Sequence, residues 1–199
     1  ITDNFYWTGG TVLAEFYLHH RLSEDIDLFC EADEVDQKLV GTFLTKAKKS
    51  LKIKDIVPTN FLGLYSYNLT YQNGDKLKVD FNYYPFPRIN IGKKYKNIEI
   101  DSDYDIAVNK VHTIAIKPRA RDFIDIYFLI KEKNYSFEDL LLRAKVKFDW
   151  HIDKIILGTQ LLKALDVSDY PRMIKKIAHK KWKKFFVKES EKLGEEIFK

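Results

Sequence analysis

Cysteine, methionine and long apolar runs are scarce in this sequence. Its 199 residues contain one cysteine, Cys30, which excludes an internal disulfide, and one methionine. A lone cysteine is typical of proteins kept in a reducing compartment, so we expect a cytoplasmic protein. No apolar run approaches the roughly 18 residues of a membrane-spanning helix, and the first residues do not follow the order of a signal peptide. Residue 1 is an isoleucine, and we expect native sequence before it.

The residues that are abundant predict a packed core and an uneven charge. Hydrophobic residues make up 45% of the sequence, with 14 phenylalanines and 12 tyrosines, and charged residues make up 32%. The net charge is +5, and residues 170–199 alone hold ten Lys or Arg and four Glu, a net of +6. This basic segment has two interpretations. Its lysines either solvate an amphipathic helix whose aromatic residues enter the core, or they bind an RNA backbone or an acidic protein.

Hydrophobic periodicity and turn residues predict an α+β fold in two parts. Asn73-Gly74, between candidate strands 64–71 and 76–84, is the strongest hairpin signal. We expect a helix from Asp33, its N-cap, to residue 51, and then a strand over 53–57 that Pro58 ends. Further strands are expected at 5–8, 26–30 and 98–100, and helices at 11–19, 103–116, 119–131, 137–148, 152–165, 172–186 and 188–198. The predicted division is a mixed α/β core, 1–101, and a helical part, 102–199.

Gly9-Gly10-Thr11 and Asp25-Ile26-Asp27 are the most informative motifs. A glycine pair followed by a small hydroxyl residue suits a backbone that closes around phosphate oxygens. Two aspartates one residue apart on a strand project from the same face, roughly 6.5–7 Å apart along the chain. Hard divalent cations prefer such oxygen ligands. A phosphate-binding turn followed by metal-binding carboxylates indicates phosphoryl or nucleotidyl transfer.

Asp80 is the third carboxylate that we assign to this site. It lies in a predicted strand that could pair with the Asp25/Asp27 strand in one sheet, whereas Asp75 is a worse-placed rival. Asp80 would bind a second metal ion, or accept the proton of an attacking hydroxyl.

Arg21 and Ser23, just before the acidic pair, are candidates for contact with phosphate or for orienting the carboxylates. Arg21 could equally form a salt bridge with Glu24 or Asp25. The five histidines and Cys30 do not have the spacing of a zinc site.

In their order along the chain, these motifs resemble the AbiEii/AbiGii-type toxin family of the DNA polymerase β-like nucleotidyltransferases. The resemblance covers residues 6 to about 130 and includes two later motifs, Lys110 and Arg121-Asp122-x-x-Asp125. It implies a nucleotidyltransferase-type mixed sheet with flanking helices, followed by a C-terminal helical region. It also implies that Lys110 steadies the triphosphate and that Asp122, rather than Asp125, is the functional aspartate. Relatives tend to carry arginine where this chain has Lys117, with Arg119 nearby.

The resemblance further implies a function. The protein would be the toxin of a toxin–antitoxin or phage-defence pair, transferring a nucleotidyl group from a nucleoside triphosphate to an acceptor such as a tRNA end. It would use Mg²⁺ or Mn²⁺, and its partners would be the triphosphate, the RNA and a cognate antitoxin, with no membrane. Two alternatives stay open: a triphosphate-binding regulator without transfer activity, and a small-molecule nucleotidyltransferase of the antibiotic-modifying kind. The basic segment favours a polyanionic acceptor.

Overall fold

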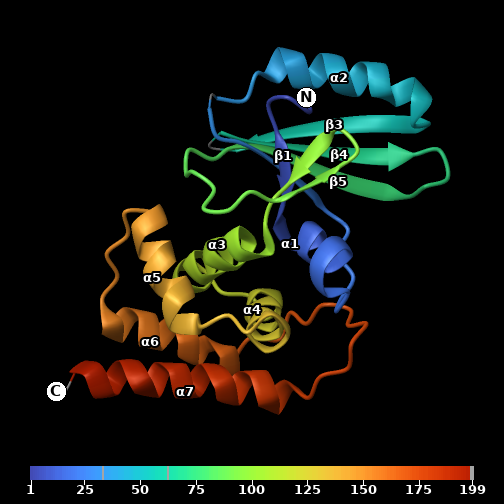
Figure 1. Cartoon of the computed structure of the whole chain (residues 1–199). Helices are drawn as coiled ribbons and strands as arrows, with labels where there is room; N and C mark the ends of the chain where they lie inside the picture. Colours follow the sequence, from blue (N-terminus) through green and yellow to red (C-terminus); the bar gives the residue numbers. More distant parts are fainter. Residues whose placement is uncertain (33, 62, 198–199) are drawn as a thin grey trace. The chain divides into compact units, whose positions relative to one another are not determined.

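Two compact units make up the computed structural model, which describes residues 1–32, 34–61 and 63–197 (Figure 1). The first unit is Ile1–Val12 together with Ser23–Ser102, and the second is Leu13–Leu22 together with Asp103–Lys199. The chain therefore enters the second unit twice. Compared with the contiguous division into 1–101 and 102–199 that the sequence suggests, segment 13–22 belongs to the second unit and Ser102 to the first.

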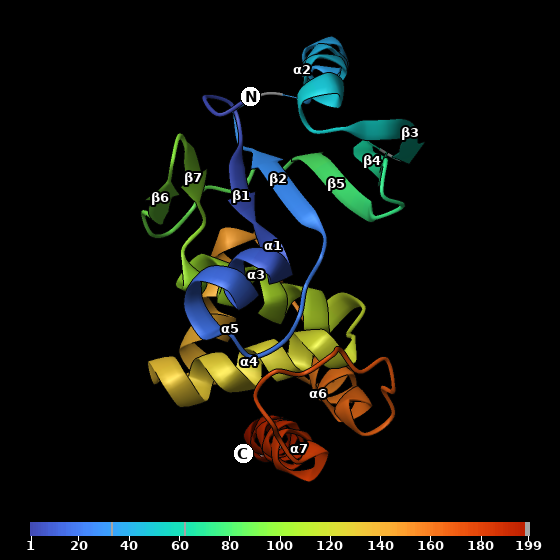
Figure 2. The ribbon, with the colours of Figure 1, turned by 90° about the vertical axis from the view of Figure 1, so that its right-hand side faces the viewer.

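A seven-stranded mixed sheet forms most of the first unit (Figure 2). Its strands are β1 (Tyr6–Thr8), β2 (Ile26–Cys30), β3 (Ile53–Phe61), β4 (Leu64–Tyr71), β5 (Lys76–Tyr83), β6 (Lys93–Tyr95) and β7 (Ile98–Ile100), in the order β3-β4-β5-β2-β1-β7-β6. β2 runs antiparallel to β1 and parallel to β5. The sequence predicted β2 and β7 with these bounds, and it predicted the β4–β5 hairpin to within one residue.

Several elements of the first unit differ from the prediction. Helix α2 (Gln37–Ser50) begins after Asp36, whose carboxylate accepts the first backbone N–H groups of the helix. The predicted N-cap, Asp33, lies outside the described residues. β3 continues through Pro58, because β3 is an edge strand and an outward-facing position there needs no backbone N–H. β6 was not predicted, since its three residues are all exposed and carry no apolar alternation.

The core of the first unit lies between the sheet and α2. Val40 and Leu44, one helical turn apart, belong to the same buried cluster as Leu28, Val79 and Phe81. Because side chains alternate along a strand, the residues between these core positions point to the opposite face of the sheet. That face carries polar and aromatic side chains, among them Asp27 and Asp80, which the sequence singles out.

The second unit is helical. It contains the π-helix η1 (Leu13–Leu18), the helices α3 (Asp103–Ile116), α4 (Ala120–Lys133), α5 (Phe137–Lys147), α6 (Lys154–Leu162) and α7 (His179–Ile197), and the 3₁₀ turn η2 (Lys163–Leu165). η1 directly follows the short helix α1 (Gly9–Val12). The helix predicted over 11–19 therefore begins at the glycine pair and changes from an α-helix to a π-helix at residue 13. No helix among the described residues combines the length and the apolar character needed to cross a membrane.

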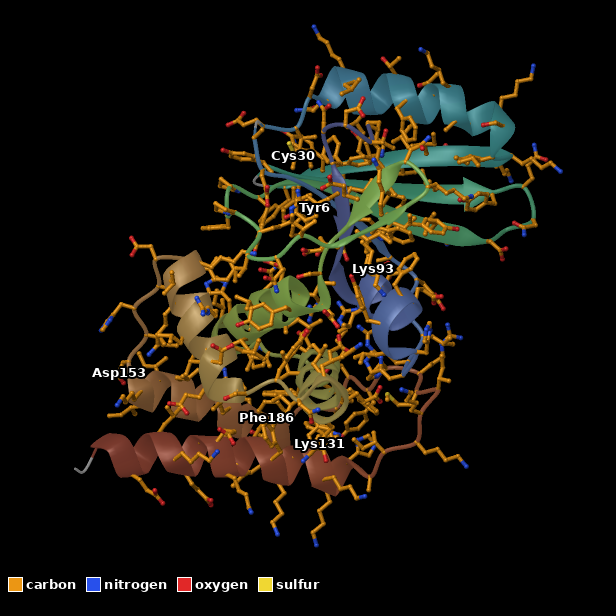
Figure 3. All side chains as sticks on the ribbon, viewed as in Figure 1. Tyr6, Cys30, Lys93, Lys131, Asp153 and Phe186 are labelled. Atoms are coloured by element: carbon orange, nitrogen blue, oxygen red, sulfur yellow. The ribbon has the colours of Figure 1, made fainter. Side chains whose placement is uncertain are left out.

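One helix, α7, replaces the two that were predicted over 172–186 and 188–198. Its Trp182 and Phe186 are fully buried and lie against Phe123 of α4, and Figure 3 shows Phe186 within the packed helices. Residues 172–175 are not helical, because their backbone groups bond to another segment. The N–H of Leu22 donates to the carbonyl of Arg172, and the carbonyl of His20 accepts from residues 174 and 175.

Candidate functional site

Two aspartates lie side by side on the polar face of the sheet. Asp27 of β2 is paired in register with Asp80 of β5, and in the same row Thr8 of β1 and Ser66 of β4 flank them. Neighbouring strands are about 4.8 Å apart, so the two carboxylates can share a ligand. The prediction that the Asp80 strand lies beside the Asp27 strand is confirmed by this pairing.

The two oxygens of Asp80 have different surroundings. Oδ2 accepts a hydrogen bond from Nζ of Lys78 at 2.5 Å. Oδ1 is buried and has no hydrogen-bond partner. A buried carboxylate oxygen without a partner is costly, and it is satisfied by a cation or by a proton donor of a ligand.

The turn at Gly9 and Gly10 touches the acidic row directly. Gly9 has a positive φ of 82°, and a Cβ at this position would lie 2.1 Å from Oδ2 of Asp27. Only glycine allows this backbone conformation and this approach. The structure therefore brings the glycine pair and Asp27 together, with Gly10 next in the first turn of α1.

Thr11, Ser23 and Asp25 also come together, through internal bonds. The Thr11 hydroxyl bonds to the Ser23 hydroxyl at 2.9 Å and makes a short hydrogen bond to the backbone carbonyl of Asp25. Thr11 is buried, and this contact ties the start of the helix to the start of β2. The Asp25 side chain is half-buried just before β2.

The fit of a divalent cation rests on Asp27 and Asp80. Across residues 1–32, 34–61 and 63–197, no three His, Cys, Asp or Glu side chains gather closely enough to hold a metal ion. The residues present nevertheless suit a cation, because two carboxylates are adjacent and Oδ1 of Asp80 lacks a partner.

The remaining predicted residues, Arg21, Lys110 and Asp122, form a separate buried network in the second unit. Nζ of Lys110 lies 2.8 Å from Oδ1 of Asp122 and 2.8 Å from Oδ2 of Asp125. Arg21 binds Asp125 through two nitrogens, at 2.6 and 2.8 Å. Arg119 binds Asp122, at 2.9 and 3.3 Å. The network joins η1–β2 connector residues to α3 and α4.

Asp125 is the centre of this network. Its side chain is fully buried and also accepts from Nε2 of His20 at 2.7 Å. Burial by itself raises the pKa of Asp125, but Lys110 and Arg21 outweigh it and hold that pKa well below its usual range. The pKa of Asp122 is lowered in the same way, as Lys110 and Arg119 outweigh its burial.

The sequence did not identify the role of Asp125. It suggested Glu24 or Asp25 as partners of Arg21, and the structure gives Arg21 the partner Asp125 instead. A signal was present, because Phe123 and Ile126 on either side mark that region of α4 as buried, and a buried aspartate requires cations.

Several solved structures share this fold. A nucleotidyltransferase candidate from H. pylori has a TM-score of 0.60 at 19% identity, over 97% of this chain and 87% of that one. MenT4, a nucleotidyltransferase toxin of Mycobacterium tuberculosis, has a TM-score of 0.58 at 14% identity, over 96% and 76%. JHP933 from Helicobacter pylori has a TM-score of 0.54 at 18% identity, over 98% and 88%. The fold is that of the nucleotidyltransferases.

The family follows from the sequence. Residues 1–194 match the family described as nucleotidyl transferase AbiEii toxin, type IV toxin–antitoxin system, and the chain belongs to this family. It is also 29% identical over 157 residues to an uncharacterized protein of Aquifex aeolicus, which covers 74% of this chain and 68% of that protein. The resemblance and the α+β fold class predicted from the motifs are thereby confirmed, and so is nucleotidyltransferase activity as the class of reaction.

Proposed function

We propose that this protein transfers a nucleotidyl group from a nucleoside triphosphate to a hydroxyl at an RNA end, such as that of tRNA, with Mg²⁺ or Mn²⁺. The observation that carries the proposal is the in-register pair Asp27–Asp80, placed against the glycine turn. Phosphoryl chemistry needs positioning and charge compensation more than covalent help from the protein, and this arrangement offers both.

Each part of the row has a role in the proposed reaction. Asp27 and Asp80 would hold the cation, which offsets charge on the reacting phosphate, and Asp25, just before the strand, would join them as a third ligand once the cation is bound. Backbone N–H groups of Gly9 and Gly10 would bind the outer phosphates. Oδ1 of Asp80 would accept the proton of the attacking hydroxyl, since it is the oxygen that has no partner in the protein.

The buried network would support triphosphate binding electrostatically. Arg21, Lys110 and Arg119 carry three positive charges against two on Asp122 and Asp125, a net of +1. We propose that the positive charge of Lys110 steadies the triphosphate, and that Asp122 and Asp125 hold the Lys110 side chain in position. Ser23 and Thr11 would act by aligning the turn with Asp25.

The basic segment would bind the RNA backbone. In α7 the aromatic residues Trp182 and Phe186 are buried, while Lys180, Lys181 and Lys184 are exposed. The buried aromatic face fits the first interpretation of the segment, and we propose that the exposed lysines on the other face serve the second. Membership of a type IV family supports a cognate antitoxin as a further partner. We propose a cytoplasmic enzyme, with phage defence as its setting.

Metal-dependent triphosphate binding tests the proposal. Asp25→Asn and Asp27→Asn should each abolish Mg²⁺-dependent binding of a fluorescent triphosphate, measured by anisotropy, without unfolding the protein. Asp75→Asn, an exposed aspartate in the β4–β5 turn, is the matched control and should bind normally. Normal Mg²⁺-dependent affinity in both site variants would refute the assignment of the cation to this row.

A further inference from the structure

A second row of side chains lies beside the acidic row on the same face of the sheet. Tyr6 of β1 is paired with Phe29 of β2, and Phe29 is paired with Asn82 of β5. These residues lie two positions along their strands from the acidic row, so the two rows are roughly 6.5–7 Å apart. Both rows belong to the first unit.

Two polar atoms of this second row are buried without a partner. They are the hydroxyl oxygen of Tyr6 and Oδ1 of Asn82, on the strands to either side of Phe29. Tyr6 is only 3% exposed. Burial and the carboxylates of Asp101 and Glu31 raise the pKa of Tyr6, so its hydroxyl stays protonated and can donate. A buried donor and a buried acceptor left unpaired in the protein are costly, and a ligand can satisfy both.

The ring of Tyr6 is held in place. The Arg88 guanidinium lies over it, 4.3 Å from the ring centroid, and is itself fixed by Glu31 at 3.2 Å and Glu99 at 2.7 Å. Tyr6, which is labelled in Figure 3, also borders a cavity of about 830 Å³. Arg88, Glu31 and Glu99 line this cavity as well. The cavity extends from Tyr6 toward residues 2–5 and the start of α2, and neither Phe29 nor Asn82 lines it, so the inference rests on the row of paired residues and not on this cavity.

The position of the second row decides which ligand it faces. Thr8 precedes the glycine turn and pairs with Asp27, so the row containing Tyr6 and Phe29 lies on the far side of the carboxylates from that turn. In an in-line displacement the attacking group and the leaving group are on opposite sides of the transferred phosphorus. If the turn holds the leaving pyrophosphate, the second row lies on the side of the acceptor.

We propose that Tyr6, Phe29 and Asn82 bind the terminal nucleoside of the RNA acceptor. A nucleoside offers a ring that stacks on aromatic side chains, together with N–H, O–H and carbonyl groups that match a hydroxyl donor and an amide acceptor. Half-buried Phe29 supplies the aromatic surface, next to Tyr84 at 4.6 Å between ring centroids. This inference rests on the proposed function and identifies the acceptor site within it.

The test compares two variants that lack the unpaired atoms: Tyr6→Phe removes the hydroxyl alone, and Asn82→Leu replaces the whole amide. Tyr6→Phe and Asn82→Leu should each raise KM for a 3′-hydroxyl RNA oligonucleotide or deacylated tRNA about tenfold, the loss of one good hydrogen bond. Affinity for the triphosphate should stay within about twofold. Because each variant removes a buried unsatisfied group, its melting temperature without ligand should be unchanged or higher. Tyr83→Phe, an exposed tyrosine on β5, and Asn68→Leu, an exposed residue on β4, are the matched controls and should leave both KM values unchanged.

The possible outcomes distinguish a failure of this inference from a failure of the proposed function. A wild-type enzyme that modifies no RNA would contradict the proposed function. In that case, anisotropy with the labelled oligonucleotide, in EDTA and without triphosphate, would still show whether Tyr6 and Asn82 contribute to RNA binding. Unchanged RNA affinity in both Tyr6→Phe and Asn82→Leu would overturn the inference. Lowered melting temperatures would also overturn it, because they would reveal partners for these atoms inside the protein.

Discussion

The carboxylates of the two units have opposite surroundings. Asp122 and Asp125 in the second unit are buried, and every charge on them is matched by lysine or arginine. Asp80 in the first unit keeps one buried oxygen with no partner in the protein. A buried charge with all its partners present is the mark of a structural or positioning group, whereas an unmatched oxygen is the mark of a group that awaits a ligand. The contrast separates an aspartate pair that holds the protein together from one that can act on a substrate.

The sharpest way to break the comparison is to remove the central charge of the buried network. Asp125→Asn leaves Arg21 and Lys110 without their shared counter-charge, and should destabilise the protein by about 3–5 kcal/mol in urea unfolding. Asp166→Asn, an exposed aspartate after η2, should cost less than about 0.5 kcal/mol. Equal, small effects of the two substitutions would show that the network contributes little to stability.

Acid should act on the same network. Because the pKa values of Asp122 and Asp125 are lower in the folded protein than in the unfolded chain, their stabilising contribution is complete above about pH 4. It is lost as the pH falls below that value and through the folded-state pKa values. Urea midpoints measured from pH 5 to pH 2.5 should therefore fall more steeply for the wild type than for Asp125→Asn, and parallel curves would contradict this.

A substitution at the glycine turn should strain the first unit. Gly9→Ala places a methyl group against Asp27 in a left-handed backbone conformation, at a cost of about 1–3 kcal/mol, and should weaken triphosphate binding as well. Gly41→Ala in α2 meets no atom within 4 Å and should stabilise the protein by up to about 1 kcal/mol. Chemical denaturation measures the free energy of unfolding of both variants. Equal stability of Gly9→Ala and Gly41→Ala would show that a side chain is tolerated at position 9.

Asp80→Asn tests the carboxylate of the first unit in the same comparison. The amide removes a charge whose protein contact is the partly exposed Lys78, so stability should change by less than about 1 kcal/mol. Nucleotidyl transfer should nevertheless be lost, with single-turnover kinetics as the measurement. A large loss of stability would place Asp80 with the structural aspartates of the second unit.

The smallest expected effect concerns the lysines of α7. Replacing Lys180, Lys181, Lys183 and Lys184 with glutamine should flatten the salt dependence of RNA binding and leave triphosphate binding near normal. Lys183 should contribute least, because its Nζ already donates to the carbonyl of Leu165. Binding titrations over a range of salt concentrations give the slope, and an identical slope in the variant would leave these lysines a solvating role only.

Local patterns predicted the helices and strands of both units better than they predicted contacts between distant segments. Alternation and the Asn73-Gly74 turn defined the strands that carry Asp27 and Asp80, whereas the register that pairs the two aspartates is a finding of the structure. The partners of Arg21 could not be predicted, because Asp125 is 104 residues away and only the folded chain brings them together. The start of α7 was wrong for a related reason, since backbone bonds to residues 20 and 22 take residues 172–175 out of the helix.

The route of the chain through segment 13–22 has a consequence for how the protein can be divided. The segment leaves the first unit after Val12, joins the second, and returns at Ser23. A cut at residue 102 would therefore strip Leu13 and Leu18 of their packing partners and leave Arg21 and His20 facing solvent, in a fragment that keeps both motifs of the proposed nucleotide site. Neither half is a transferable module, so gene fusions, split reporters and recombination between relatives should work only when they keep the two halves together.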